Sequence, residues 1–387
     1  MSDSLSLYRT LIEFVWQNGI RFHDIRCLMT FVWALVGLIL SQQIHLSQWV
    51  LYRPGRAKAS SKQRQLTRWL HNSKINPSQV YGPLIKRVLQ AWAKQRLYLA
   101  LDSSSLWGQF TLVQLALIYR GRALPLAWLV LSRHSSSIGY ADYEGLLRQA
   151  ASLIPTNCEV VLLADRGFVD VKLFQLARDL CWSFRVRLKR SLWVYRANKP
   201  PTKVGRLMPA QGQVLFVHKV WLTQQWFGPV YLALAHVQTA KGYEQWAIVS
   251  DEPTDLQTLT EYGWRFDIEE HFLDDKSAGF QLESSEIREA EALARLILIV
   301  AVATLYLVNS GVAVVTTRQQ HQVDAHWQRG LSYLQIGWRW LRQALAQGKR
   351  LFKLLWLRPG PDPHPVFASA KQAAQPIVII SAILLLT

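Results

Sequence analysis

One stretch of the chain, residues 296–317, contains no charged side chain. A run of this length either spans a bilayer, which takes ~20 apolar residues, or is buried in the core of a large protein. It follows the amphipathic segment EIREAEALAR, and it contains Asn309, Ser310 and Gly311. We therefore predict a helix buried behind a sheet, with a membrane span as the alternative. The 387 residues leave room for such a core and for two or three domains.

The middle of the chain predicts a layered α/β fold. Residues 96–132 contain three apolar strand-like runs, RLYLALD, FTLVQLALIYR and ALPLAWLVLS, the last two joined by a turn at Gly121 and Arg122. Helical spacing follows over residues 140–154, and then come the buried strand CEVVLLAD and the helix VDVKLFQLARDL. Strand, hairpin, helix, strand and helix in this order are typical of a sheet with helices packed against it.

The charge balance favours a polyanionic partner. The chain has 44 Lys and Arg against 26 Asp and Glu, a net charge of +18, which attracts nucleic acid or an anionic membrane surface. From residue 182 to residue 243 there are ten cations and no acid, spread over short β-like runs. For residues 182–250 we predict a β-rich insertion that lies against DNA, with a solvated basic surface as the alternative. Its expected DNA contacts are Arg185, Arg187, Lys189 and Arg190.

The N-terminal residues 1–95 are predicted to be helical and basic. Pro54 and Gly55 break the chain before the segment SKQRQLTRWLHN, which is expected to form a basic helix. A helix, a turn and a basic helix are compatible with DNA-end recognition, and a small helical cap with a solvated face is the alternative. The expected DNA contacts of this region are Lys62, Arg64 and Arg68.

The C-terminal residues 313–387 are also predicted to be helical. The segment 328–358 alternates apolar and basic positions, and residues 377–386 form an apolar tail. A basic amphipathic helix binds DNA, a membrane surface or a partner subunit, and exposed apolar surface usually marks an interface. We expect this region to serve dimerisation or DNA contact, and packing against the core is the alternative.

Four polar side chains lie at helical spacing in the stretch EYGWRFDIEEHFLDDKSAG: Tyr262, Arg265, Glu269 and Lys276. At about 100° per residue, all four fall within roughly a 60° stripe of one helix. A carboxylate flanked by cations suits a metal ligand working beside a phosphate. The alternative is an ordinary surface pair between Arg265 and Glu269, four residues apart.

Two aspartates follow apolar strand-like runs, Asp102 after RLYLAL and Asp165 after CEVVLLA. Together with Glu269 they make a plausible carboxylate cage for two metal ions. Their oxygen donors suit Mg²⁺ or Mn²⁺. Taken singly, Asp102 could begin a turn, and Asp165 could pair with Arg166.

Cysteine usage points to a reducing compartment. Cys27, Cys158 and Cys181 show no CxxC spacing, so neither a zinc site nor a disulfide framework is indicated. They are typical of reduced core residues in a cytoplasmic protein.

Taken together, these motifs resemble the DDE transposases of bacterial insertion sequences, in the subgroup with a Y-R-E-K signature, insertion-sequence family four. The resemblance covers roughly residues 97–308 and includes Asp-Arg-Gly-Phe at 165–168. It implies an RNase H-like core formed by residues 96–181 and 251–312, interrupted by the insertion at 182–250. It also implies that Asp102, Asp165 and Glu269 are a catalytic triad holding two Mg²⁺ or Mn²⁺ ions, and that Tyr262, Arg265 and Lys276 bind phosphates near the cleaved end.

The resemblance implies a function as well. The protein would bind the terminal inverted repeats of an insertion sequence, cut the strands by metal-dependent hydrolysis and join the 3′-hydroxyl ends to target DNA. It would act as a homodimer on two DNA ends, in the cytoplasm with the nucleoid. Two alternatives stay open: a catalytically inactive, domesticated DNA-binding relative, and a stand-alone metal-dependent nuclease. A tryptophan of the insertion would stack on a flipped base, and the candidates are Trp182, Trp193, Trp221 and Trp226. For each of them taken singly, packing in the β-core is the favoured alternative.

Overall fold

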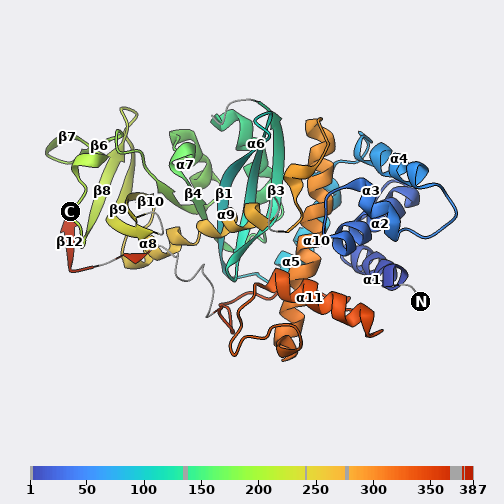
Figure 1. Cartoon of the computed structure of the whole chain (residues 1–387). Coiled ribbons are helices and arrows are strands. Elements are labelled where there is room, and N and C mark those ends of the chain that lie inside the picture. Colours follow the sequence, from blue (N-terminus) through green and yellow to red (C-terminus); the bar gives the residue numbers. More distant parts are fainter. Residues whose placement is uncertain are drawn as a thin grey trace.

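The computed structural model of the chain describes residues 3–133, 138–239, 242–274, 279–366, 377–378 and 380–386. It is a mixed α/β protein, in which helices flank one end of a large mixed sheet (Figure 1). The N-terminal helices and the last strand, β12, lie at opposite ends of the molecule (Figure 1).

The regular elements of the described chain up to residue 90 are all helices. Asp24 caps the second of them by accepting a hydrogen bond from the Arg26 backbone N–H, and Asn76 caps the fifth in the same way through Ser78. The second helix ends at Gln42, which has left-handed backbone geometry with φ 58°. The helices are α1 (Asp3–Gln17), α2 (Ile25–Ser41), α3 (Leu46–Trp49), α4 (Ala59–Leu70) and α5 (Pro77–Gln90), with a 3₁₀ turn at Val50–Tyr52.

The sheet has 12 strands within the described residues, in the order β3-β2-β1-β4-β5-β10-β9-β8-β6-β7, with β11 paired to β9 and β12 to β8. Strands β1, β4 and β5 run parallel, and β2 and β3 extend the sheet on one side as an antiparallel hairpin. The strands are β1 (Arg96–Leu106), β2 (Phe110–Tyr119), β3 (Arg122–Ser132), β4 (Glu159–Ala164), β5 (Trp182–Arg187), β6 (Trp193–Arg196), β7 (Lys199–Lys203), β8 (Gln213–Leu222), β9 (Phe227–Thr239), β10 (Gly242–Ser250), β11 (Ile377–Val378) and β12 (Ala382–Leu386).

Strand β5 begins at residue 182, where the insertion was expected to start. It pairs in parallel with β4, which pairs in parallel with β1. Its apolar residues Phe184 and Val186 face the main core. The remaining strands, β6 to β10, continue the sheet through an antiparallel seam between β5 and β10 that contains three residue pairs.

The helices after the hairpin are α6 (Tyr140–Ala151), α7 (Val171–Asp179), α8 (Leu256–Gly263), α9 (Phe266–Leu273), α10 (Ala290–Thr316) and α11 (Tyr333–Ala346). The helix predicted over residues 296–317 is α10. It is long and apolar enough to cross a membrane, and the whole of its apolar window is buried inside the protein. It lies between the sheet and the N-terminal helices (Figure 1).

The polar residues of α10 have structural partners. The Asn309 side chain donates to the Leu354 carbonyl and accepts from the Trp356 backbone N–H. Gly311 lets α11 cross closely, because a Cβ at this position would lie 1.9 Å from the carbonyl oxygen of Tyr333. These contacts explain why a polar triplet stands in the middle of an apolar run.

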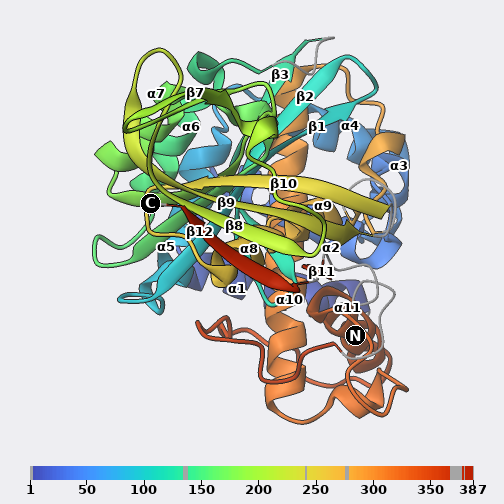
Figure 2. The same ribbon diagram turned by 90° about the vertical axis from the view of Figure 1, so that its left-hand side faces the viewer.

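The C-terminal tail differs from the helical expectation. After α11, residues 377–378 and 382–386 are strands that pair with β9 and β8. The run AILLL of β12 has no polar positions that could form the outer face of an amphipathic helix, whereas β8 offers it backbone hydrogen bonds. Figure 2 shows β12 beside β8. The side chains from Ile383 to Leu386 are exposed.

Candidate active site

The two predicted aspartates lie on neighbouring parallel strands. Leu101 of β1 is in register with Ala164 of β4, and Asp102 and Asp165 are the next residues along these strands. β4 ends there, and Asp165 precedes a 3₁₀ turn. β1 continues to Leu106 and pairs Asp102 with Gln114 of β2. The sequence had indicated that Asp102 ends a strand, with the start of a turn as the alternative. In the structure Asp102 lies within β1, beside the end of β4.

Arg265 joins Asp102 to the predicted glutamate. Its Nη1 donates to Asp102 Oδ2 at 2.8 Å, and its Nη2 donates to Glu269 Oε1 at 2.7 Å. The Arg265 side chain is 5% exposed, the Asp102 side chain 16% and the Glu269 side chain 49%. The structure thus brings a strand residue and a helix residue together around one guanidinium.

The electrostatics of Asp102 include all three carboxylates. The pKa of Asp102 is raised to about 6: burial raises it, the Arg265 charge and the Ser103 backbone N–H lower it, and the negative charges of Glu269 and Asp165 raise it. Burial lowers the pKa of Arg265, but its neighbours Tyr262, Asp102 and Glu269 raise it more, so this guanidinium stays charged. At this site the buried Arg265 guanidinium therefore interacts electrostatically with all three carboxylates, those of Asp102, Asp165 and Glu269.

The Y-R-E-K stretch is not one helix. Tyr262 lies near the end of α8, Glu269 lies in α9, and Arg265 stands in the tightened turn between them. Around this turn the backbone bonds run three residues back, as from the Arg265 N–H to the Tyr262 carbonyl and from Ile268 to Arg265. Tyr262, Arg265 and Glu269 therefore do not lie along one straight helix, as the spacing had predicted. Lys276 lies outside the described residues.

Tyr262 is not at the surface where a phosphate contact was expected. Its ring is fully buried in a second hydrophobic cluster and packs edge-on against Trp246 at 5.0 Å between ring centroids. Burial raises the pKa of Tyr262 to about 12. Its hydroxyl makes no hydrogen bond of normal geometry within the described residues. In this arrangement Tyr262 supports the turn that presents Arg265.

Arg122, which the sequence did not single out, ties α9 to the sheet through two acids. Arg122, at the start of β3, donates to Asp274 at 2.9 Å and lies 3.6 Å from Glu270. His271 is buried beside them, and burial and the Arg122 charge lower its pKa to about 3. Glu270 and Asp274 are four residues apart on one helix face, and this spacing could have indicated a shared cation. Their partner Arg122 is distant in sequence, so the spacing alone could not identify it.

Arg185 was predicted to contact DNA, and the structure corrects this. Its guanidinium is buried and is paired with Glu252 at 2.5 Å and with Glu261 at 3.3 Å, and Ser250 Oγ lies at 2.6 Å. Arg187 is partly buried and pairs with Glu244 at 3.0 Å. Glu244, Glu252 and Glu261, which neutralise these two arginines, lie after the acid-free segment in the sequence. Fewer of the segment's positive charges are therefore unpaired than its sequence indicated.

Four other predicted cations are solvent-exposed: Lys189, Arg190, Arg64 and Arg68. Lys62 is half-buried and donates to the backbone carbonyl of Arg53. DNA contact by the exposed cations stays a prediction.

The candidate stacking tryptophans divide by burial. Trp182 is buried in the main core, the packing role that was the alternative to base stacking. Trp226 and Trp193 are 57% and 41% exposed. Trp226 lies 4.8 Å from the Tyr195 ring and 6.2 Å from the Trp221 ring, and the Lys203 ammonium stands 5.4 Å from the ring of Trp193. Exposed aromatic rings beside lysine are the composition of surfaces on which bases stack.

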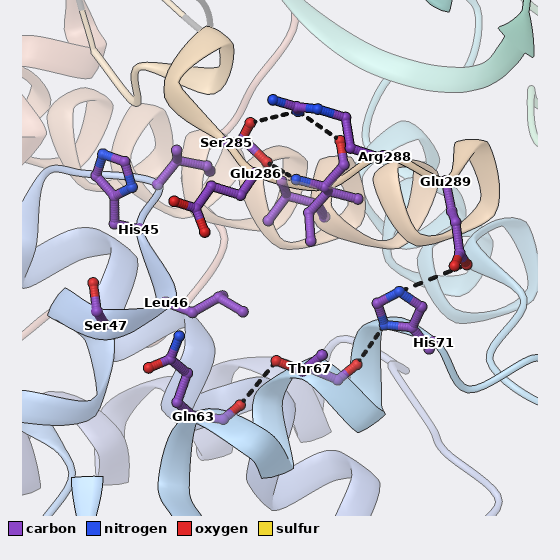
Figure 3. Close-up of a pocket in the computed structure, with 13 residues that line it drawn as sticks. His45, Leu46, Ser47, Gln63, Thr67, His71, Ser285, Glu286, Arg288 and Glu289 are labelled. Carbon is purple, nitrogen blue, oxygen red and sulfur yellow. Dashed lines mark hydrogen bonds and ion pairs between the residues drawn. The ribbon is translucent and has the colours of Figure 1, made fainter. Parts of the chain in front are cut away.

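A separate pocket of about 340 Å³ lies between the N-terminal helices and the segment that leads into α10 (Figure 3). His71 faces Glu289 across it at 3.6 Å. The three predicted carboxylates do not line this pocket, so it is not the site of the predicted chemistry.

The predicted metal cage is not assembled in this arrangement. Within the residues that the structure describes, no group of three or more His, Cys, Asp or Glu side chains is placed to hold a metal ion. The oxygen donors are of the right chemical kind for Mg²⁺. However, Arg265 already binds two of them, at the place where a shared cation would bind.

Comparison with known proteins gives little beyond this geometry. No protein-family model matches the chain, and no curated protein matches it. Among solved structures, the chain is similar to one described as the cryo-EM structure of piggyBac transposase synaptic complex with hairpin DNA. The sequence identity is 10% and the TM-score 0.44, over 96% of this chain and 88% of that one. A similarity of this degree leaves function to be argued from the residues themselves.

Proposed function

We propose that this protein is a DDE-type DNA transposase, which cuts DNA at the ends of a mobile element and joins the 3′-hydroxyl ends to target DNA. The observation that supports the proposal is that Asp102 of β1 lies beside Asp165, the residue that follows β4, and that Arg265 links Asp102 to Glu269 of α9. The strand–hairpin–helix–strand–helix order of β1 to α7 supports an RNase H-like core. In this proposal the protein acts as a homodimer on two DNA ends, in the cytoplasm with the nucleoid.

The charge distribution supports a DNA substrate. Lys189, Arg190, Arg64 and Arg68 are exposed cations on a protein with net charge +18, and such cations neutralise backbone phosphates. Trp193 and Trp226 offer exposed rings to unstacked bases, and the Lys203 ammonium lies 5.4 Å from the Trp193 ring. Mg²⁺ or Mn²⁺ belongs to the proposal through the chemistry of the oxygen donors alone, because Arg265 is bound to two of the three in the described arrangement.

The test uses labelled duplexes made from the DNA that flanks the reading frame on each side. The full chain is incubated with each duplex and a target plasmid in Mg²⁺ or Mn²⁺. We expect strand cleavage near a short inverted repeat, followed by joining of the cut end to the plasmid. Asp102→Asn, Asp165→Asn and Glu269→Gln should each abolish both steps and leave duplex binding largely intact. Asp179→Asn, an exposed acid at the end of α7, is the matched control.

The outcomes separate the alternatives. Cutting without joining would make the protein a nuclease. Binding without cutting would make it a DNA-binding relative without catalysis. That result is expected if Arg265 never leaves Asp102 and Glu269. Near wild-type cleavage by any one variant would remove that residue from the triad.

A further inference from the structure

We propose that Arg265 is a built-in counter-ion that competes with divalent cations for Asp102 and Glu269, so that cation binding requires the guanidinium to leave the two carboxylates. The inference rests on the proposed function, because it concerns the same carboxylates. It assigns to Arg265 a role that differs from the phosphate contact implied by its motif.

The first support is the bonding of the guanidinium. Two different nitrogens of Arg265 each donate a short, charge-assisted hydrogen bond, one to Asp102 and one to Glu269. A divalent cation shared by these two carboxylates would be attracted by the same negative charges, and two cations held so close together would repel one another. Arg265 and a divalent ion therefore compete for this position.

The second support is the contrast in burial. The Arg265 side chain is 5% exposed and the Glu269 side chain 49%. Glu269 thus reaches solvent as well as Arg265, whereas Asp102 is largely enclosed and depends on a nearby positive charge. When Arg265 leaves, another cation has to take its place, because an unpaired buried carboxylate is costly.

The third support is the position of Arg265 in the backbone. It stands in the tightened turn between α8 and α9, outside the regular part of either helix. Its Nε makes no hydrogen bond within the described residues. The side chain is therefore held by the two carboxylates and by the Phe266 ring, whose centroid lies 4.6 Å from the guanidinium carbon, and no hydrogen bond from Nε adds to these contacts.

A structural ion pair elsewhere in the chain provides the matched control. Arg295 on α10 is as buried as Arg265 and also pairs with a glutamate four residues away, Glu291, at 3.1 Å. It donates to two backbone carbonyls, of Ile75 and Leu70, and so resembles an arginine that only stabilises the fold. Its removal should weaken the fold without changing cation affinity.

The experiment measures binding of Mn²⁺ alone, by electron paramagnetic resonance of the free ion, to the full chain without DNA. Arg265→Gln should bind Mn²⁺ at least about tenfold more tightly than the wild type, since the ion no longer has to break charge-assisted hydrogen bonds. Mn²⁺ should also raise the melting temperature of Arg265→Gln more than that of the wild type or of Arg295→Gln. Arg265→Lys, whose single ammonium cannot donate from two nitrogens, should have intermediate affinity, and it serves if the Gln variant does not fold.

Two results would overturn the inference, and they differ in what else they overturn. Equal or weaker Mn²⁺ binding by the folded Arg265 variants, with clear binding by the wild type, would refute the competing counter-ion and leave the proposed function standing. Mn²⁺ binding by neither the wild type nor the variants would refute both the counter-ion and a metal-dependent function.

Discussion

Replacing Arg185 by methionine tests whether the acid-free segment presents its arginines to DNA or to the protein interior. In the structure, Arg185 and Glu261 are each 4% exposed and face one another at 3.3 Å. Removing one partner of a buried pair leaves the other charge uncompensated, which costs about 3–5 kcal/mol. Tyr98 donates to Glu261 at 2.7 Å and Gln257 at 3.1 Å, which offsets part of the cost. We therefore expect a loss near the lower limit, about 3 kcal/mol.

The assay is urea-induced equilibrium unfolding of the full chain, followed by tryptophan fluorescence and by circular dichroism. Arg185→Met should lower the free energy of unfolding as stated, and the double variant Arg185→Met, Glu261→Gln should recover at least half of the loss, because the stranded charge is then gone. Arg190→Met, an exposed arginine of the same segment, should stay within about 0.5 kcal/mol of the wild type.

One result would refute this reasoning. If Arg185→Met unfolded within about 1 kcal/mol of the wild type and bound duplex DNA clearly more weakly, Arg185 would be a DNA contact, as its sequence context indicates, and the buried network would be wrong.

Three further predictions follow from other parts of the molecule. Burial lowers the pKa of His271 from 6.5 to about 3, so between these pH values this side chain binds a proton only in the unfolded chain. The free energy of unfolding should therefore fall as pH decreases from 6.5 towards 3. His271→Gln should flatten this dependence, as measured by urea unfolding at a series of acidic pH values. Gly311→Ala places a methyl group 1.9 Å from the first carbonyl oxygen of α11 and should cost about 1–3 kcal/mol, whereas Gly145→Ala, on α6 with open space around it, should be neutral or stabilising by thermal melting. Neutralising Lys189 and Arg190 to glutamine should reduce the slope of log affinity against log salt for duplex DNA by up to about 1.8, and an unchanged slope would exclude this surface as a phosphate contact.

The strands and the buried helix were predictable because their signals are local. Runs such as CEVVLLAD combine apolar side chains with β-branching, and they form strands wherever a sheet can bury both faces. The charge-free run that became α10 had two physical solutions, and burial against a sheet was the correct one. The pairing of two strands that each lead to an aspartate was a local expectation as well, and the observed register places Asp102 beside Asp165.

The details of the site depended on contacts that no local pattern contains. Arg185 meets Glu252 and Glu261 across 67 and 76 positions of sequence, so counting charges within a window could not reveal their neutralisation. The spacing of Tyr262, Arg265 and Glu269 fits an ideal helix, but packing of Tyr262 against Trp246 goes with a tightened turn that redirects Arg265 to Asp102. Spacing thus identified which residues gather, and tertiary packing determined how they are joined.

The position of α10 has a consequence for the order in which the protein can be made. This helix contacts α2, α4, α5 and β3, all of which precede it in the chain, and α11, which follows it. During synthesis, the apolar faces that receive α10 leave the ribosome at least 150 residues before the helix does, because β3 ends at residue 132 and α10 begins at residue 290. Nascent or truncated chains that stop before residue 290 therefore expose these faces to water and to one another, which makes them the form of this protein most prone to aggregate and most dependent on chaperones.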